Sequence, residues 1–192
     1  MERRYIKTKN ISTREASDGG KHLTGYFAVF NNSYEVCPGW IETIAPGAFA
    51  RYIASGGPVK ALWNHDSNIV LGNTIPQTLT LKEDEIGLFG DILINEADTD
   101  ALNGYARVGR GDVEGCSFGF DIAHQDEWWD DDGVYHTVIR EVDPLYEVSP
   151  CTFPAYSATS IEARSMERLE QARAKRREAW RSEMIKRLKG DN

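Results

Sequence analysis

A histidine, a serine and a glutamate in this sequence have neighbours that suit nucleophilic catalysis. His65 follows the apolar segment Val59–Trp63, a predicted strand, and lies between Asn64 and Asp66. An imidazole at the end of a strand can be held in place and still reach a substrate, as a general base must. Taken alone, however, His65 fits a half-exposed histidine in a surface loop better than a catalytic base.

Ser117 lies in the extended segment Gly115–Asp121, whose alternate side chains point to opposite faces of a strand. Phe118 and Phe120 would then face the core, while Ser117 would face outward beside Gly119. The small glycine leaves room for a peptide carbonyl to approach the hydroxyl. The segment lacks the Gly-x-Ser-x-Gly pattern of a nucleophile elbow, and an outward serine on a strand is in itself ordinary.

Glu147 shares one face of another predicted strand with Ser149 and Cys151. A carboxylate flanked by apolar residues can accept the second N–H of an imidazole and so orient the ring, which is the third role in a serine triad. A carboxylate on a strand surface is an equally good interpretation of Glu147 until His65 and Ser117 are placed beside it.

The elements that must position these residues are mainly short strands. Aromatic and β-branched segments bounded by turn residues predict strands at Leu23–Phe30, Ile75–Leu81, Leu88–Asn95, Ser117–Ala123, Val134–Glu141 and Tyr146–Thr152. The acidic segment Asp126–Gly133 is predicted to be the loop of a long hairpin. Apolar residues at helical spacing predict helices at Pro46–Ala54 and Asp98–Val108, the second ended by Gly109. Many short strands with few helices and no regular β-α alternation indicate a mainly β or α+β domain.

The composition divides the chain of 192 residues near position 160. Residues 161–192 hold ten of the 22 Lys/Arg and six of the 30 Asp/Glu, so they carry a formal charge of +4 and leave -12 on residues 1–160. We therefore predict one domain over residues 1–160 and a basic, solvated, weakly amphipathic helical tail over residues 161–192. Nucleic-acid binding by the acidic domain is not expected, because an acidic surface does not attract phosphate backbones.

Several classes of protein and site are not expected from this sequence. The apolar runs are too short to span a membrane, and the N-terminus lacks the apolar stretch of a secretory signal, so the expected compartment is cytoplasmic. Cys37, Cys116 and Cys151 indicate neither a disulfide framework nor a zinc site, and Cys116 and Cys151 are predicted to be small buried side chains. Neither a metal nor a cofactor is expected, because paired histidine ligands and glycine-rich phosphate loops are absent.

Six short blocks between residues 20 and 160 are more informative together than any of them alone. They are Gly25–Phe30, Ile44–Phe49, Trp63–Asp66 with Leu71–Gly72, Gly87–Leu88, Ser117–Phe120, and Glu147–Ser149 with Thr152–Tyr156. In this order, the blocks resemble the prohead (procapsid) maturation proteases of tailed bacteriophages.

The resemblance implies a serine endopeptidase related in fold to the herpesvirus assemblins, a β-barrel ringed by a few helices, here with a C-terminal helical tail. It implies that His65 is the general base and Ser117 the nucleophile. Assemblins use a second histidine as the third member of the triad, whereas in the phage family an acid is expected, and Glu147 occupies that position. Its rivals for this role are His124, His136 and Asp143.

The same resemblance implies a place of action and partners. Such proteases act in the host cytoplasm inside the assembling prohead, digest the scaffold or the scaffolding segment of the major capsid protein, and usually cut themselves. The basic tail would then serve packaging or interaction and be removed later, or it would pack on a neighbouring subunit. Neither a nucleic acid nor a membrane is required, and a homo-oligomer is left open.

Two other functions remain open from the sequence. The first is a catalytically inactive capsid-assembly or scaffold-binding protein on the same fold, although the intact blocks around His65 and Ser117 favour activity. The second is a metal-dependent hydrolase that uses His65, Asp66 and another histidine, although no recognisable spacing of metal ligands supports it.

Overall fold

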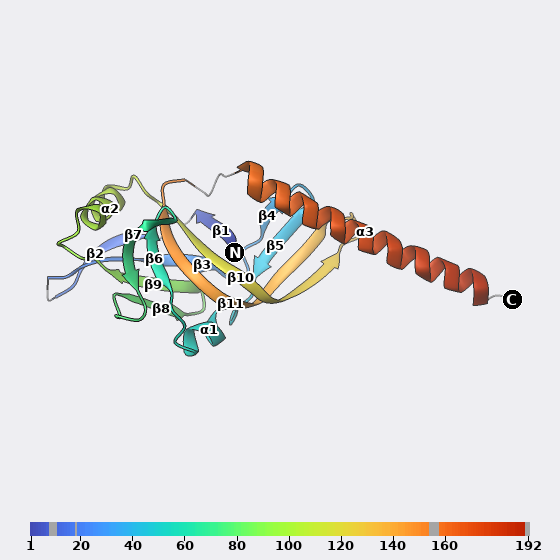
Figure 1. The fold of residues 1–192 in the computed structure, drawn as a ribbon, viewed down its shortest axis with the longest axis horizontal. Coiled ribbons are helices and arrows are strands. Elements are labelled where there is room, and N and C mark those ends of the chain that lie inside the picture. The colour runs from blue at the N-terminus through green and yellow to red at the C-terminus, as the bar shows by residue number, and fades with distance from the viewer. Residues whose placement is uncertain (8–10, 18, 154–157, 191–192) are drawn as a thin grey trace.

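The structure, a computed structural model, describes residues 1–7, 11–17, 19–153 and 158–190. These residues form a strand-rich, mixed α/β body from which a long C-terminal helix projects (Figure 1). The strands are β1 (Glu2–Lys7), β2 (Ser12–Glu15), β3 (Lys21–Val29), β4 (Tyr34–Cys37), β5 (Trp40–Ile44), β6 (Lys60–Trp63), β7 (Asp66–Asn73), β8 (Leu79–Glu83), β9 (Gly87–Leu93), β10 (Gly115–Trp129) and β11 (Tyr135–Cys151). The helices are α1 (Ala50–Ala54), α2 (Thr99–Arg110) and α3 (Ala158–Gly190).

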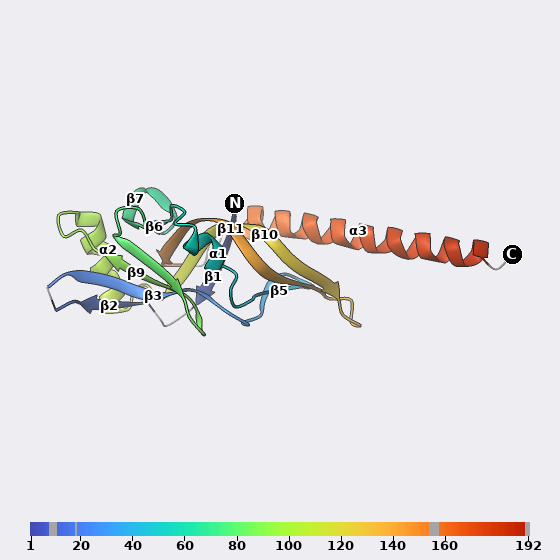
Figure 2. The same ribbon diagram turned by 90° about the horizontal axis from the view of Figure 1, so that it is seen from below.

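Two sheets make up the body. The larger sheet runs in the order β1-β10-β11-β5-β4, with β6 paired to β11 and β7 paired to β6, and the smaller sheet runs β2-β3-β9-β8. The long antiparallel hairpin of β10 and β11 runs from the middle of the body toward the side from which α3 projects (Figure 2). Because β11 is 17 residues long, its first part pairs in parallel with β5 and its last part pairs in parallel with β6.

The core lies where the predicted strand pattern places it. Phe118 and Phe120 of β10 are fully buried and stack on each other, as alternation along a strand predicts. Phe49, just before α1, meets Phe118 edge-to-face with 5.5 Å between ring centroids. The expected strand at Leu23–Phe30 is confirmed as β3, and its expected neighbour at Leu88–Asn95 is confirmed as β9.

Several predicted boundaries are wrong for local reasons. The helix at Pro46–Ala54 is shorter, because turns occupy its first residues and α1 begins at Ala50. The helix α2 begins after its N-cap Asp98 and continues past Gly109 to Arg110, where it is capped by Gly111, whose φ of 84° only glycine adopts readily. The strand β8 begins at Leu79 rather than Ile75, because a turn closed by the hydrogen bond from Gln77 N to Thr74 O precedes it.

The hairpin is longer than the sequence predicts. The expected loop Asp126–Gly133 is strand as far as Trp129, and the turn is held by the hydrogen bond from Val134 N to Asp130 Oδ1. The two strands expected at Val134–Glu141 and Tyr146–Thr152 are one strand, β11. It continues through Pro144 because the pairing register shifts nearby, and a proline without an N–H is tolerated at such irregularities.

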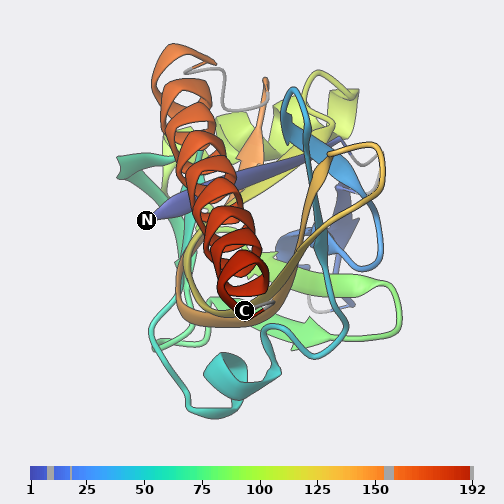
Figure 3. The ribbon, with the colours of Figure 1, turned by 90° about the vertical axis from the view of Figure 1, so that its right-hand side faces the viewer.

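The C-terminal helix is confirmed, and its buried contact with the body is made in its first part. Leu169 is fully buried against Trp40 of β5 and Tyr135 of β11. From residue 174 to residue 188 every side chain is exposed, and the helix extends well beyond the strands (Figure 1). Seen from its C-terminal side, the helix points toward the viewer in front of the body (Figure 3). No helix in the described part of the chain is long and apolar enough to cross a membrane.

Candidate active site

His65 lies in a tight turn between β6 and β7. Asn64 and His65 both have positive φ, 52° and 62°, as the two-residue hairpin turns that match strand twist require. Asn64 ties this turn to the end of β11, since its N–H donates to Pro150 O at 3.1 Å and its Oδ1 accepts from Thr152 N at 2.9 Å. The histidine therefore sits on a turn that is fixed at its base.

The imidazole of His65 is paired with Glu147 of β11. The distance between His65 Nδ1 and Glu147 Oε1 is 2.7 Å, and the two side chains are only 8% and 4% exposed. Because a carboxylate oxygen can only accept, Nδ1–H donates the hydrogen bond, and Nε2 is the ring nitrogen left to accept a proton. The expectation that His65 is held is confirmed, but the side chain is largely buried rather than exposed.

Ser149 holds the other side of this carboxylate. Its hydroxyl donates to Glu147 Oε2 at 2.5 Å and accepts from the backbone N–H of His65 at 3.3 Å. A β-carbon at Gly119 would lie 2.6 Å from Glu147 Oε1, so the carboxylate leans over a position that only glycine leaves open. The carboxylate orientation is thus set by a hydroxyl, an imidazole and the space above Gly119.

Ser117 lies on the same face of the sheet as Ser149 and Glu147. In the β10–β11 pairing Ser117 is opposite Ser149 and Gly119 is opposite Glu147, and directly opposite residues project to the same side. The expectation of an outward, accessible serine is wrong, because Ser117 is fully buried. Its hydroxyl donates at 2.8 Å to the backbone carbonyl of Arg4 in β1, the strand on the other side of β10.

The remaining ring nitrogen of His65 is the unusual atom of the site. Nε2 is buried and has no hydrogen-bond partner among the described residues. Buried polar atoms are nearly always paired, and a native exception often marks a group that needs its partner only during function. An imidazole with one nitrogen oriented by a carboxylate and the other unengaged can accept a proton from a nearby hydroxyl.

The other candidates for the third position lie elsewhere. His136 contacts Asp130 at the far end of the hairpin, with 2.8 Å between Nε2 and Oδ2, and stacks on Trp128. His124 and Asp143 are exposed, on β10 and β11 respectively. Of the four side chains considered, Glu147 is the one in contact with His65.

The two thiols near the site are buried, as predicted. Cys116 precedes Ser117 in β10, and Cys151 ends β11. Burial, followed by the nearby Glu147 carboxylate, raises the pKa of the Cys151 thiol to about 12. A thiol of this pKa stays protonated near neutral pH and is a poor nucleophile.

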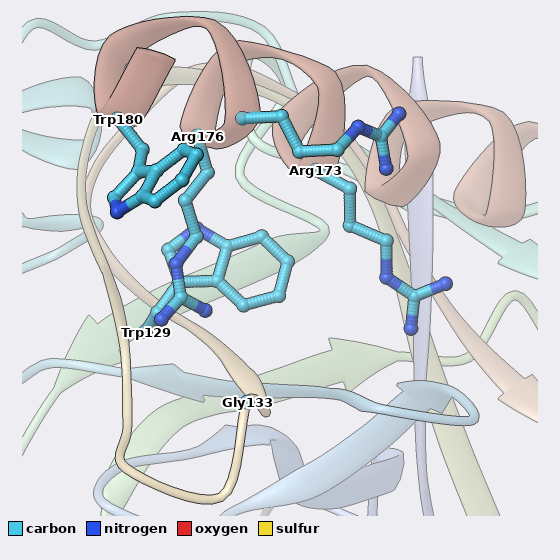
Figure 4. Close-up of a pocket in the computed structure, with 6 residues that line it drawn as sticks. Trp129, Gly133, Arg173, Arg176 and Trp180 are labelled. Atoms are coloured by element: carbon cyan, nitrogen blue, oxygen red, sulfur yellow. The ribbon is translucent and has the colours of Figure 1, made fainter. Parts of the chain in front are cut away.

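Other features of the described residues do not add to this site. Within the described ranges, no group of three or more His, Cys, Asp and Glu side chains is placed to hold a metal ion. A separate pocket of about 360 Å³ lies between the hairpin tip and α3, where Arg176 reaches down onto Trp129 with 5.0 Å to the ring centroid (Figure 4). Arginines and tryptophans dominate its lining, which holds no nucleophile or carboxylate.

Comparison with known proteins shows which family the chain belongs to. The family model of the caudovirus prohead serine protease matches residues 7–172. The chain belongs to this family. It is also 32% identical over 175 residues to the prohead protease of Enterobacteria phage HK97, an alignment that covers 88% of this chain and 73% of that protein. No solved structure is significantly similar to it.

The protein is therefore a serine protease of the prohead class. Two contributors to its candidate site were missed from the sequence. Ser149 was noted only as a strand neighbour of Glu147, and the spacing of the two on one face was the available signal. The contact of Arg4 with Ser117 left no local signal, because 113 positions separate the two residues.

Proposed function

We propose that this protease cuts the scaffold, or the scaffolding segment of the major capsid protein, inside the assembling prohead, and that it also cuts itself. Ser117 is the nucleophile, His65 the general base and Glu147 the acid that orients the imidazole. The observation that carries this proposal is the buried pair of His65 Nδ1 and Glu147 Oε1 at 2.7 Å, with Nε2 unpartnered among the described residues and Ser117 on the same sheet face as Glu147.

The chemistry follows from these roles. His65 Nε2 takes the proton of the Ser117 hydroxyl as Oγ attacks a peptide carbonyl carbon, which gives a tetrahedral intermediate. The same nitrogen then donates its proton to the leaving amine, and an acyl-enzyme forms on Ser117. Water, deprotonated by His65, releases the acid product and restores the serine. Throughout, Glu147 stabilises the imidazolium, and Ser149 keeps Glu147 in place.

We also infer that the strands of the first 160 residues close into an assemblin-like β-barrel with α1 and α2 at its rim. The support is the junction between the two sheets. Asn73 at the end of β7 accepts from Thr78 N at 3.1 Å, just before β8 of the other sheet, and donates to Thr78 Oγ1 at 2.9 Å. Gly72 lies so close that a β-carbon there would be 2.7 Å from Thr78 O.

We treat residues 161–192 as a separate functional segment, a basic tail for packaging or interaction that is later removed. Its support is the formal charge of +4, against -12 for residues 1–160, and the exposure of the α3 side chains from residue 174 to residue 188. Such a projecting basic helix suits a contact with an acidic partner more than it suits packing on its own acidic body.

The decisive experiment compares two adjacent buried serines. The chain is co-expressed with its matching capsid protein, and products are identified by mass spectrometry. Ser117→Ala is expected to lower cleavage about 10⁴-fold or more, because the nucleophile is lost. Ser149→Ala is expected to lower it about tenfold, because one hydrogen bond to a carboxylate is lost.

The pair controls for burial, since both serines are fully buried on facing strands. Both variants should keep the melting temperature of a folded protein. Normal processing by Ser117→Ala, or a complete loss confined to Ser149→Ala, would contradict the assignment of Ser117.

A further inference from the structure

The N-terminal strand β1 lies where an extended peptide would have to bind. It forms the edge of the larger sheet and pairs antiparallel with β10 at six positions, with Tyr5 opposite Ser117 (Figure 1). Only its last residue falls within the family match, which begins at residue 7. Without β1, the edge of the strand that carries Ser117 would be open to another peptide.

The contact between β1 and Ser117 withdraws the hydroxyl from catalysis. The Ser117 hydroxyl donates a hydrogen bond to the Arg4 carbonyl oxygen at 2.8 Å, while His65 Nε2 has no partner among the described residues. Ser117 is also fully buried, so no substrate carbonyl can reach it. A backbone carbonyl of β1 thus holds the place beside the nucleophile that a substrate carbonyl must take.

We propose that the edge of β10 beside Ser117 is the substrate-binding edge, and that β1 occupies it in the resting protein. The ligand is an extended peptide segment that adds to β10 as a strand, the mode in which main-chain hydrogen bonds supply affinity. The inference rests on the proposed function, since it takes Ser117 as the nucleophile. Cleavage requires β1 to move away first.

Three charged contacts hold β1 in place. The guanidinium of Arg4 is buried against the buried carboxylate of Glu42. The amino group of Met1 contacts Asp121 of β10 at 2.9 Å, and Glu2 contacts Arg168 of α3 at 3.1 Å. The last contact joins the C-terminal helix to the strand that covers the nucleophile.

A reversible cross-link tests the proposal in the full-length chain. Ile6 is the register partner of the native Cys116, and antiparallel partners have Cα atoms at the separation that a disulfide needs. Ile6→Cys is oxidised, and the cross-link is verified by mass spectrometry. A fluorophosphonate probe then measures labelling of Ser117, and purified capsid protein measures cleavage.

We expect the oxidised variant to be neither labelled nor active, and the same sample to recover both after reduction. Wild type passed through the same oxidation and reduction is the control. Equal labelling and cleavage in the oxidised and reduced forms would overturn the proposal. So would failure of the cross-link to form, because β1 would then not have the register that covers Ser117.

A second variant tests the opposite direction. Arg168→Gln removes the contact with Glu2 and should speed labelling of Ser117 about two- to fivefold, the effect of one exposed ion pair on the opening of β1. Arg168 is a better target than Arg4, whose loss would leave the Glu42 carboxylate buried without its cation. Arg187→Gln is the matched control, because it breaks an exposed pair with Glu183 far along α3.

The outcomes separate this inference from the proposed function. If Ser117 is not labelled even in reduced Ile6→Cys and in wild type, and Ser117→Ala still cleaves, the assigned nucleophile is wrong and the inference falls with it. If Ser117 is labelled and required, but neither the cross-link nor Arg168→Gln changes its rate, the protease assignment stands and the role of β1 is wrong.

Discussion

A histidine–carboxylate pair lies near each end of the β10–β11 hairpin, and the two pairs have similar nitrogen–oxygen distances but different exposure and surroundings. At one end His65 and Glu147 are 2.7 Å apart, and at the other His136 and Asp130 are 2.8 Å apart. The side chains of the first pair are 8% and 4% exposed, and those of the second are 21% and 35% exposed. The distance between the ring nitrogen and the carboxylate oxygen alone therefore does not identify a catalytic histidine.

What separates the two pairs is their surroundings. Around His65 the carboxylate is also fixed by Ser149, and the second ring nitrogen is buried beside the face that carries Ser117. His136 instead stacks on Trp128 in a pair that solvent reaches. Electrostatic interactions are strong where water is excluded and weak where it is not, so only the first pair can orient and stabilise an imidazolium efficiently.

The largest contrast is expected from the histidines themselves. His65→Asn should lower kcat/KM about 10⁴-fold or more, because the general base is lost. Asparagine is the suitable replacement, since it tolerates the positive φ of 62° at this position. His136→Asn should change activity by no more than about twofold, as expected at a partly exposed position. Cleavage of purified capsid protein measures both variants. Comparable losses of activity in the two would contradict a catalytic role that belongs to His65 and not to His136.

A smaller contrast is expected from the carboxylates. Glu147→Gln should lower kcat about 10²- to 10⁴-fold, because the imidazole loses its charged partner while the shape of the site is kept. Asp130→Asn should leave kcat unchanged within about twofold. Single-turnover cleavage rates measure both. An unchanged kcat in Glu147→Gln would mean that another residue, such as His124, His136 or Asp143, is the third member of the triad.

Asp130→Asn also has an effect on stability that depends on pH. The hydrogen bond from His136, followed by that from the Val134 N–H, lowers the pKa of Asp130 below its ordinary value. A lowered pKa in the folded state stabilises the protein above the ordinary pKa, and this contribution is lost as the pH falls through the folded value. The difference in melting temperature between wild type and Asp130→Asn should therefore shrink in acid. A melting-temperature difference that grows in acid would contradict a stabilising contact between His136 and Asp130.

The smallest effect is expected from the thiol beside the site. With a pKa of about 12, roughly one Cys151 thiol in 10⁴ is ionised at pH 8. Iodoacetamide should therefore change cleavage by less than about twofold at this pH, whereas a fluorophosphonate should abolish it. The same reagent applied to the unfolded chain is the control for reactivity. Stoichiometric alkylation of Cys151 with loss of cleavage would indicate that the nucleophile is a cysteine and not Ser117.

Much of the candidate site was predictable from local patterns. Alternation along β10 predicts the buried Phe118 and Phe120 and puts Ser117 on the opposite face, and the structure agrees. The spacing of Glu147 and Ser149 puts both on one face, where they bind each other. The position of His65 after a strand is confirmed as well. These predictions succeed because the direction of a side chain depends on a few neighbouring residues.

The failures concern what covers a face and where an element stops. Ser117 was expected to be accessible, but it is fully buried, and β1 pairs with β10 along the edge beside it. Three strands and a loop were expected where β10 and β11 form one long hairpin, because irregular pairing carries β11 through Pro144. Local propensity is a weak guide at such places, since pairing with a distant strand overrides it.

The sequence by itself predicted which side chains would carry the chemistry, fixed the strand faces of Ser117 and Glu147, and showed a basic C-terminal segment after an acidic one. Only the tertiary structure decided that His65 contacts Glu147, that Ser149 holds the carboxylate, and that the Arg4 carbonyl accepts a hydrogen bond from the Ser117 hydroxyl. The physical reason is range. Backbone geometry fixes the direction of a side chain within a few residues, whereas each of the contacts with His65 and Ser117 joins residues more than 80 positions apart and exists only once the sheet has formed.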